Sequence, residues 1–323
     1  MRTALAAAAA ALALSAGTAP SAAPADESPV AVTLALEERL CVAGKPLRVR
    51  VAVENRGRAS LALHNALLFG AGLTARGADG TVRTASERNA PSGAQQPLLL
   101  PAGASLSALV DVAPLFPDLC AAPGTLQLDW TVAGVAAAPL ALEVRRDWSG
   151  YGARLECDLG VIDLELFFAQ APATVANFLD LAEAGFYDGQ SFHRVVKNFM
   201  VQGGCPNGDG SGDGPRQLRL EAGRGDGFPR HLRGTLSMAH KADPHSGSCQ
   251  FFLCHRDQPA LDGNYAAFGR IAKGLEVLDA IAEVPCALVP GGPDAGPSKP
   301  KQRVTIQRIR PLAPAAAGTD GGP

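Results

Sequence analysis

Short segments in which apolar and polar residues alternate fill the chain from about residue 28 to residue 145. In residues 47–53 every second position is apolar, and the turn-forming sequence ENRG follows directly. Alternation with a period of two predicts a strand with one buried face. Similar segments occupy residues 61–63, 106–110, 126–132 and 140–144. No helical period competes with them, and the Ala- and Pro-rich residues 85–104 are expected to form a loop.

The spacing of these strands and turns predicts an immunoglobulin-like β-sandwich over residues 28–145. No constellation of catalytic residues accompanies it, because His64 stands alone and the aspartates lie near turns or on strand faces. We therefore expect this part to serve spacing, docking or client binding. Residues 146–150 form a short polar stretch that ends in Ser149 and Gly150, and they are expected to be a linker.

A different pattern begins at residue 151. Residues 155–159 and 162–166 alternate again on either side of Gly160, which predicts a hairpin of two half-buried strands. Pro172 suits the first turn of a helix, and Gly185 lies just past its end. The apolar residues between them fall at i, i+3, i+4 and i+7, as expected for a helix with one face on a sheet: Val175, Phe178, Leu179 and Ala182.

The sequence predicts further strands and one more helix towards the C-terminus. The strands are expected at residues 191–196, 199–202, 235–239, 250–254 and 266–271, and a last one holds Val304 and Ile306. The second helix carries Leu275, Leu278 and Ile281. About eight strands and two helices predict a closed antiparallel barrel with a helix over each end, within residues 151–312. The fold class is thus mainly β, and residues 313–323 are expected to be a disordered tail.

The first 25 residues have the three regions of a secretory signal. Met1 and Arg2 precede an apolar run over residues 4–14, and small residues continue to Ala25. That run is too short for a hydrocarbon core that needs about 20 residues, so residues 1–25 are predicted to be a cleaved signal peptide. The protein is therefore expected to be exported. No other long apolar run follows, so no membrane span is expected.

Charge and cysteine content narrow the partners and the compartment. The chain has 29 Lys and Arg against 31 Asp and Glu, which gives a formal charge of -2. It therefore lacks the net positive charge that would attract nucleic acid. Seven cysteines in an exported protein permit disulfides, and the odd number leaves one thiol over. Cys41 and Cys120 are the only two in the N-terminal region, which makes a bridge between them the first candidate. The pattern of pairing and the oligomeric state are left open.

Four blocks of the C-terminal half resemble the signature of the cyclophilin family. They are SFHRVVKNFMVQGG at 191–204, GTLSMA at 234–239, SCQFFL at 248–253, and LDG at 261–263 with FG at 268–269. They occur in the family's order and at similar spacings. The resemblance implies the eight-stranded barrel with two helices, and it implies rotation about the bond that precedes proline in peptides and unfolded or extended client proteins. Because bacterial cyclophilins are similar, a periplasmic location is favoured over an extracellular one.

The resemblance also implies which residues act. The family's catalytic positions match Arg194, Phe199 and Gln202. The implied substrate-binding residues are His193, Met200, Ala239, His240, Gln250, Phe252, Leu261 and Tyr265. Ala260 stands where many members carry tryptophan, which implies a thinner pocket wall and weak cyclosporin sensitivity. His240 replaces a common asparagine and Tyr265 replaces a common histidine. The resemblance therefore implies that activity is kept, but it does not predict the peptide preference or the rate.

The chemistry of the reaction points to the same arginine. The barrier of about 18–20 kcal/mol comes from the loss of amide resonance as the bond twists, so neither a nucleophile nor a cofactor is required. The twisted prolyl nitrogen gains a lone pair, which an N–H of the Arg194 guanidinium can meet. Phe199, Met200, Phe252 and Leu261 would hold the apolar proline ring. Gln202 would steady Arg194.

Other kinds of site are not supported. The glycine-rich residues 203–214 lack the ending of a phosphate loop, and a calcium loop begun at Asp209 would place Leu220 where a carboxylate is needed. Cys249 and Cys254 lie an odd number of strand positions apart, which argues against a shared metal. No nucleophile elbow surrounds Ser237 or Ser248, so a hydrolase is not expected. The alternative that stays open is a non-catalytic proline-peptide binding module or scaffold.

Overall fold

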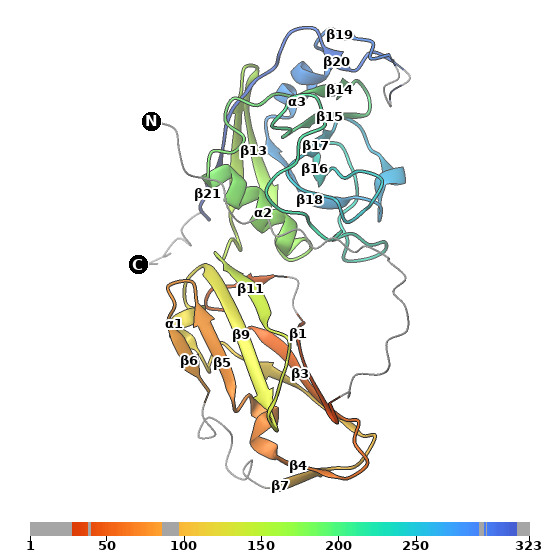
Figure 1. Ribbon diagram of the computed structural model, residues 1–323. Coiled ribbons are helices and arrows are strands. Elements are labelled where there is room, and N and C mark those ends of the chain that lie inside the picture. Colours follow the sequence, from red (N-terminus) through yellow and green to blue (C-terminus); the bar gives the residue numbers. More distant parts are fainter. Residues whose placement is uncertain (1–27, 38–39, 86–96, 291–293, 295, 315–323) are drawn as a thin grey trace, which may run out of the picture.

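The computed structural model describes residues 28–37, 40–85, 97–290, 294 and 296–314. Two bodies of β-structure follow one another along the chain (Figure 1). The predicted signal peptide at 1–25 and most of the predicted tail lie outside the described residues. Among the described residues, no helix has the length and the apolar character needed to cross a membrane.

The N-terminal body consists mainly of two sheets. The first is antiparallel, in the order β1 (Val30–Leu36), β3 (Arg48–Asn55) and β8 (Ser105–Asp111). The second has the order β2 (Cys41–Val42), β11 (Leu140–Arg145), β9 (Gly124–Val132), β5 (Leu73–Gly77) and β6 (Val82–Thr84), and β10 (Val135–Ala136) pairs with β9. A separate pair is formed by β4 (Leu61–His64) and β7 (Pro97–Leu100). The described residues of this body also form two short helices, η1 (Asn65–Phe69) and α1 (Pro117–Cys120).

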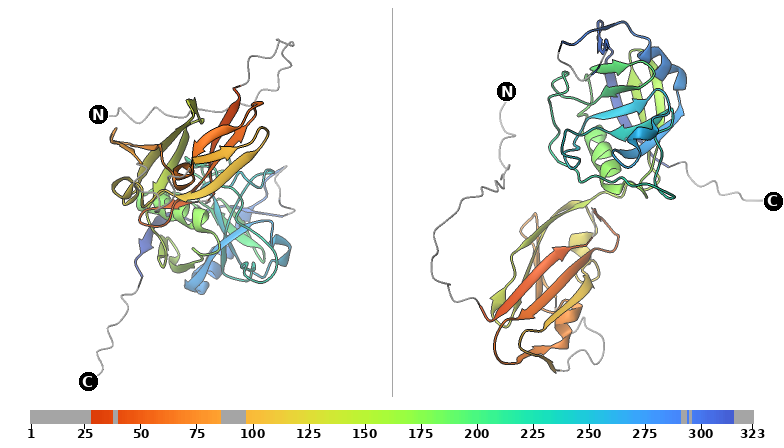
Figure 2. Two further views of the ribbon diagram at one scale, coloured as in Figure 1. Left: turned by 90° about the horizontal axis from the view of Figure 1, so that it is seen from below. Right: turned by 90° about the vertical axis from the view of Figure 1, so that its right-hand side faces the viewer.

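The buried residues of both sheets form one hydrophobic core. Figure 2 shows how the two sheets face each other. In β3 the side chains of Val49, Val51 and Val53 are buried, whereas that of Arg50 is exposed and that of Ala52 is half-buried. Trp130 of β9 is also buried, and its Nε1 donates a hydrogen bond to the Ala71 carbonyl oxygen at 3.0 Å. The strands predicted at 47–53, 61–63, 106–110, 126–132 and 140–144 are all confirmed.

Two expectations for this half were wrong. The segment at 85–104 is not entirely loop, because β7 lies within it and pairs with β4 from Leu61↔Leu100 to His64↔Pro97. Pro97 is the first residue of that strand, a position that needs no N–H donor. The suggested bridge is also not formed: Cys41 and Cys120 are both buried in the core, but no disulfide joins them.

The C-terminal body is a curled antiparallel sheet of eight strands. Their order is β14 (Arg194–Val196), β15 (Met200–Gly203), β17 (Phe251–Cys254), β16 (Thr235–Met238), β18 (Ala266–Lys273), β13 (Gly160–Leu166), β12 (Gly152–Cys157) and β21 (Ile306–Leu312). Two helices accompany it, α2 (Pro172–Glu183) and α3 (Leu275–Ala282), with a 3-10 turn η3 (Pro259–Leu261). A small hairpin is made by β19 (Cys286–Ala287) and β20 (Lys299–Pro300). The predicted hairpin, strands and helices of this half are confirmed, except that β14 covers only the end of the predicted 191–196 strand and that Val304 lies before β21.

The helices cover opposite ends of the curled sheet (Figure 1). The predicted apolar face of α2 is fully buried, with Phe178 packed edge-on against Phe251 at 5.6 Å and against Phe268 at 5.2 Å between ring centroids. The first turn of α2 leaves backbone N–H groups without helical partners. Buried Glu221 accepts from two of them, at Ala173 (3.1 Å) and Thr174 (2.7 Å).

The barrel closes less completely than predicted. The end strands β14 and β21 are not paired with each other. The seam is joined by the Ser191↔Thr305 bridge and by hydrogen bonds from Phe192 N to Val304 O (3.0 Å) and from Ile306 N to Gln190 O (2.8 Å). The chain runs from this bridge directly into β14, so the seam helps to position that strand.

Polar contacts join the two bodies around α2. Trp148, within the expected linker, is 1% exposed and packs in the core of the C-terminal body. Its Nε1 donates to Asp180 at 2.7 Å, and Arg145 at the end of β11 lies 3.3 Å from the same carboxylate. Arg216 also pairs with Glu143 of β11, at 2.5 Å.

Candidate active site

A cleft of about 150 Å³ opens over strands β14, β15, β16 and β17. Nine of the eleven residues predicted for the site line it: Arg194, Phe199, Met200, Gln202, Ala239, His240, Phe252, Leu261 and Tyr265. Gln250 lies beside it in an adjoining hollow of about 90 Å³. Only His193 is placed elsewhere, as described below. The structure thus brings together residues that are spread over about 70 positions of the sequence.

Strand register explains why the polar residues of the cleft share one face. Arg194 of β14 pairs with Gln202 of β15, and Gln202 pairs in turn with Phe252 of β17. Residues directly opposite each other in neighbouring strands point to the same face of a sheet. The intervening positions, Val195 and Val201, point the other way into the main core. A period of two therefore places one row of residues in the cleft and the other in the core.

The Arg194 guanidinium is held on two sides. Its Nη1 donates to Gln202 Oε1 at 3.1 Å, as the sequence predicted for this pair. Its Nε and Nη2 donate to the two carboxylate oxygens of Asp294, at 2.8 Å and 2.5 Å. The guanidinium carbon also lies 5.9 Å from the centre of the Phe199 ring. The hydrogen bonds from Arg194 lower the pKa of Asp294, so this carboxylate is charged at neutral pH.

A chain of amides supports Gln202 from behind. Its Nε2 donates to Gln250 Oε1 at 2.9 Å. Gln250 Nε2 then donates to the carbonyl oxygens of Gly210 and Gly212 at 2.9 Å and 2.8 Å. Because the carbonyls only accept, they fix the amide of Gln250, which in turn fixes that of Gln202. Gln202 is left with its oxygen facing Arg194, the orientation that an arginine requires.

The floor of the cleft is apolar. Met200 and Phe252 are 2% and 5% exposed, and they form a small cluster of their own with Cys254. Phe199, Leu261 and Tyr265 are partly buried against this cluster. The Phe252 ring meets the Tyr265 ring edge-on at 5.6 Å between centroids. Carbon surface of this shape suits a pyrrolidine ring, which offers no polar group to bind.

His240 and Tyr265 together form one wall of the cleft. Their rings are stacked 4.3 Å apart with an angle of 19° between planes. The His240 ring nitrogens lie 2.7 Å from the Lys241 carbonyl oxygen and 2.8 Å from that of Asn264. Ala260 itself is exposed and is not among the residues that line the cleft.

A buried hydrogen-bonded chain beneath Phe252 was not predicted. His231 is 1% exposed, and its ring stacks on Phe252 at 6.2 Å. Its Nδ1 lies 2.9 Å from Asp262 Oδ1 and its Nε2 2.9 Å from Ser237 Oγ. These are the distances of a hydrolase triad, but Ser237 is completely buried and its hydroxyl donates to the Ala266 carbonyl oxygen at 3.0 Å. The serine cannot reach a substrate, so the chain supports the floor of the cleft.

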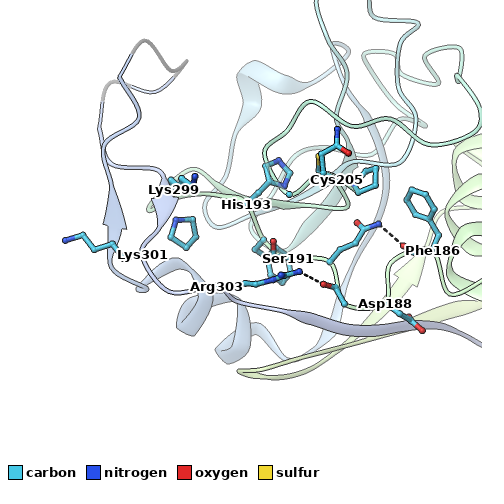
Figure 3. Close-up of a pocket in the computed structure, with 15 residues that line it drawn as sticks. Phe186, Asp188, Ser191, His193, Cys205, Lys299, Lys301 and Arg303 are labelled. Carbon is cyan, nitrogen blue, oxygen red and sulfur yellow. Dashed lines mark hydrogen bonds between the residues drawn. The ribbon is translucent and has the colours of Figure 1, made fainter.

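His193 faces a different cavity, of about 650 Å³, which Figure 3 shows in close-up. Cys205, Lys299 and Arg303 lie around the same space. Burial lowers the pKa of His193, so its ring adds no positive charge next to Arg194 at neutral pH. The assignment of His193 to substrate binding in the proline cleft therefore finds no support in its position. Within the described residues, no group of three or more His, Cys, Asp and Glu could hold a metal ion.

Comparison with known proteins assigns this arrangement to a class of enzyme. Residues 153–310 match the family described as cyclophilin type peptidyl-prolyl cis-trans isomerase/CLD. A peptidyl-prolyl cis-trans isomerase of Helicobacter pylori is 46% identical over 133 residues, which cover 41% of this chain and 80% of that protein. One of Synechococcus elongatus is 49% identical over 116 residues, covering 36% of this chain and 77% of that protein. The chain therefore belongs to the cyclophilin-type peptidyl-prolyl cis-trans isomerases and is an enzyme of that class.

Two further similarities concern the same half of the chain. Peptidyl-prolyl cis-trans isomerase B of Bacillus subtilis is 47% identical over 116 residues, covering 36% of this chain and 78% of that protein. A crystal structure of a Cryptosporidium parvum cyclophilin, obtained in the presence of the dipeptide Ala-Pro, is 32% identical. It covers 49% of this chain and 97% of its own, with a TM-score of 0.44. The family match begins at residue 153 and ends at residue 310, so it does not include the N-terminal body.

Proposed function

We propose that Arg194 speeds the rotation about X-Pro bonds by donating a hydrogen bond to the prolyl nitrogen of the twisted amide. The observation that carries the proposal is the position of the guanidinium at the rim of an apolar cleft, with Gln202 and Asp294 bound to it. A guanidinium has five N–H hydrogens, and three of them are donated within the protein. Two remain for the substrate.

The apolar cleft would supply the rest of the rate enhancement by binding the proline ring and excluding water. The pyrrolidine ring would lie on Phe252 and Met200, with Phe199 and Leu261 beside it. Removing the amide from water disfavours its charge-separated resonance form, and gripping the ring lets one side of the bond turn against the other. The backbone N–H of Ala239 already donates to Gln250 O at 2.9 Å, so pairing with the peptide would fall to the carbonyl of Ala239 and to His240.

The expected contribution of Arg194 follows from one hydrogen bond. A bond to a charged group contributes about 1.5–3 kcal/mol, and each 1.36 kcal/mol is tenfold in rate, so Arg194 would supply about ten to a few hundredfold. Arg154 offers a matched control, because it is also an arginine on a strand of the same sheet, bound to Asp163 at 2.6 Å. It pairs with that residue across β12 and β13, away from the cleft.

The test is an isomerisation assay on a peptide with one X-Pro bond, comparing wild type, Arg194→Ala and Arg154→Ala. We expect kcat/KM to fall by about ten to a few hundredfold in Arg194→Ala and to stay within about twofold in Arg154→Ala. Wild-type activity in Arg194→Ala would refute the proposed role. A protein that binds proline peptides without speeding their exchange would instead be the non-catalytic clamp.

We propose further that the enzyme acts after export, on unfolded or extended client proteins. The motivation is the sequence of residues 1–25, which favours a cleaved signal, with the periplasm as the expected compartment. N-terminal sequencing of protein recovered from a bacterial host's periplasm should begin at Asp26. Recovery of an uncleaved chain from the cytosol alone would contradict the proposal.

For the N-terminal body we propose an immunoglobulin-like sandwich, residues 28–145, that docks the isomerase domain of residues 151–312 or helps to bind its clients. The polar contacts around Asp180 support a fixed attachment rather than a loose one. Comparing the full chain with residues 146–323, which keep the core residue Trp148, in the peptide assay and in refolding of a proline-limited protein tests this. A difference confined to the protein substrate is expected if the sandwich binds clients.

A further inference from the structure

Asp294 contacts the Arg194 guanidinium, although it lies in none of the sequence motifs that predicted the site. It lies 100 positions after Arg194 in the sequence, between β19 and β20. Its two carboxylate oxygens accept from Nε and Nη2 of the same guanidinium, a bidentate pairing along one edge. Its side chain is 10% exposed and that of Arg194 is 28% exposed. A pair so placed is restricted in geometry as well as attracted by charge.

The carboxylate is itself anchored to the strand that carries Arg194. Ser298 is 3% exposed, and its side chain hydrogen-bonds to Asp294. The Ser298 carbonyl oxygen accepts from Val195 N at 2.7 Å, and the Ser298 N–H donates to Ala287 O at 3.0 Å. Val195 follows Arg194 directly in β14. Asp294 and Arg194 are thus tied to neighbouring points of the same backbone framework.

We propose that Asp294 is a positioning residue for the isomerisation, which fixes the Arg194 guanidinium so that its free Nη1 and Nη2 hydrogens face the prolyl nitrogen. This inference rests on the proposed role of Arg194. Gln202 holds the guanidinium through Nη1, and Asp294 holds it along the opposite edge. Together they leave one hydrogen on each terminal nitrogen. The guanidinium would otherwise rotate about a long, flexible side chain.

The opposite role, in which the carboxylate weakens the arginine by neutralising it, does not follow from this reaction. Rotation about the amide bond creates a lone pair on a neutral nitrogen and no net negative charge. What the transition state needs is an N–H donor at the correct place, and a counter-ion at the far edge leaves that donor in place. Correct orientation of a catalytic group is worth a large factor in rate, because a misplacement of about 1 Å can cost about a hundredfold.

The experiment compares Asp294→Asn and Asp294→Ala with Asp163→Asn. Asp163 is the matched control, since it accepts from Nε and Nη2 of Arg154 at 2.6 Å and 2.9 Å in the same bidentate manner, outside the cleft. We expect kcat to fall by about ten to a hundredfold in both Asp294 variants, with KM within about twofold, because the proline pocket is unchanged. Asp163→Asn should keep wild-type values of both constants.

A second readout is independent of turnover and of any loss of stability. In nitrogen-15 NMR spectra, the Nε–H signal of Arg194 should exchange slowly with water in the wild type and faster in Asp294→Asn. The signal of Arg154 should not change in that variant.

Three results would overturn the inference: a kcat within about twofold of wild type in Asp294→Asn, a rise in kcat, or a loss carried entirely by KM. Arg194→Ala separates this failure from that of the proposed function. If Arg194→Ala loses activity while Asp294→Asn does not, the arginine acts and only the positioning role fails. If Arg194→Ala keeps activity, the proposed mechanism itself is wrong.

Discussion

Replacing Gln202 by leucine tests the other support of the guanidinium. Gln202 accepts from Arg194 Nη1 at 3.1 Å and donates to Gln250 at 2.9 Å, and leucine removes both hydrogen bonds at similar volume. A leucine at this position would also lie beside the apolar residues Met200 and Phe252, so we expect no loss of packing. The folded state should therefore remain intact while the arginine loses one of its three protein contacts.

The size of the effect can be worked out from those contacts. A hydrogen bond to a charged group contributes about 1.5–3 kcal/mol. Asp294 keeps two of the three bonds to Arg194, so the lower end of that range applies. A loss of about 1.4 kcal/mol in transition-state stabilisation corresponds to a decrease of about tenfold in kcat/KM.

The assay is the exchange of an X-Pro peptide at substrate concentrations well below KM, together with a thermal melt to check folding. Gln127→Leu is the control, because Gln127 also lies on a strand but in the N-terminal body, where it donates to Asp129 at 3.1 Å. We expect its kcat/KM to equal that of wild type. A Gln202→Leu enzyme that melts normally and retains full activity would refute the reasoning that the amide positions the arginine.

Other predictions concern the pocket, the attachment of the two bodies and pH. Phe252→Leu should raise KM for proline peptides about fivefold through lost contact area, with a cost in stability below about 1.5 kcal/mol; unchanged KM would contradict the assigned ring pocket. Asp180→Asn should lower the free energy of unfolding by about 1.5–3 kcal/mol, because Trp148 and Arg145 lose a charged partner. Urea melts measure this change, and an unchanged midpoint would argue against a fixed attachment of the two bodies. Burial lowers the pKa of His231, so the unfolded chain binds more protons than the folded one near and below about pH 6.5, and the free energy of unfolding should fall as pH falls through that value. In His231→Gln the free energy of unfolding should depend less steeply on pH. An equal pH dependence in both proteins would exclude His231 as its source.

The residues of the cleft were predicted from the sequence blocks that resemble the cyclophilin family, and the strands and helices around them from local patterning. Arg194, Gln202 and Phe252 share a face because they lie directly opposite one another on neighbouring strands, a register that the structure supplies. The helix face of α2, by contrast, was predicted from spacing. That feature depends on neighbours within a few residues, which a sequence displays directly.

The contacts that the sequence did not predict join residues that are far apart along the chain. Asp294 meets Arg194 from 100 positions away, and His231 meets Asp262 across 31 positions. Neither residue lies in a periodic segment, so no pattern indicated the meeting. The incomplete closure of the barrel is of the same kind, since it depends on how β21 approaches the segment before β14. His193 shows the converse: a match to a family motif does not settle the direction in which a side chain points.

The central claim is that a single correctly placed N–H donor lowers the barrier, and Arg194→Lys tests it most directly. Lysine keeps the positive charge but removes the planar group that Gln202 and Asp294 hold. Two-dimensional exchange NMR on one X-Pro peptide measures binding and cis-trans exchange in the same sample. We predict an unchanged dissociation constant and an enzyme-driven exchange rate reduced by at least about tenfold. Wild-type exchange in Arg194→Lys would contradict the account, because the N–H groups of a flexible ammonium would then serve as well as a guanidinium held in place by Gln202 and Asp294.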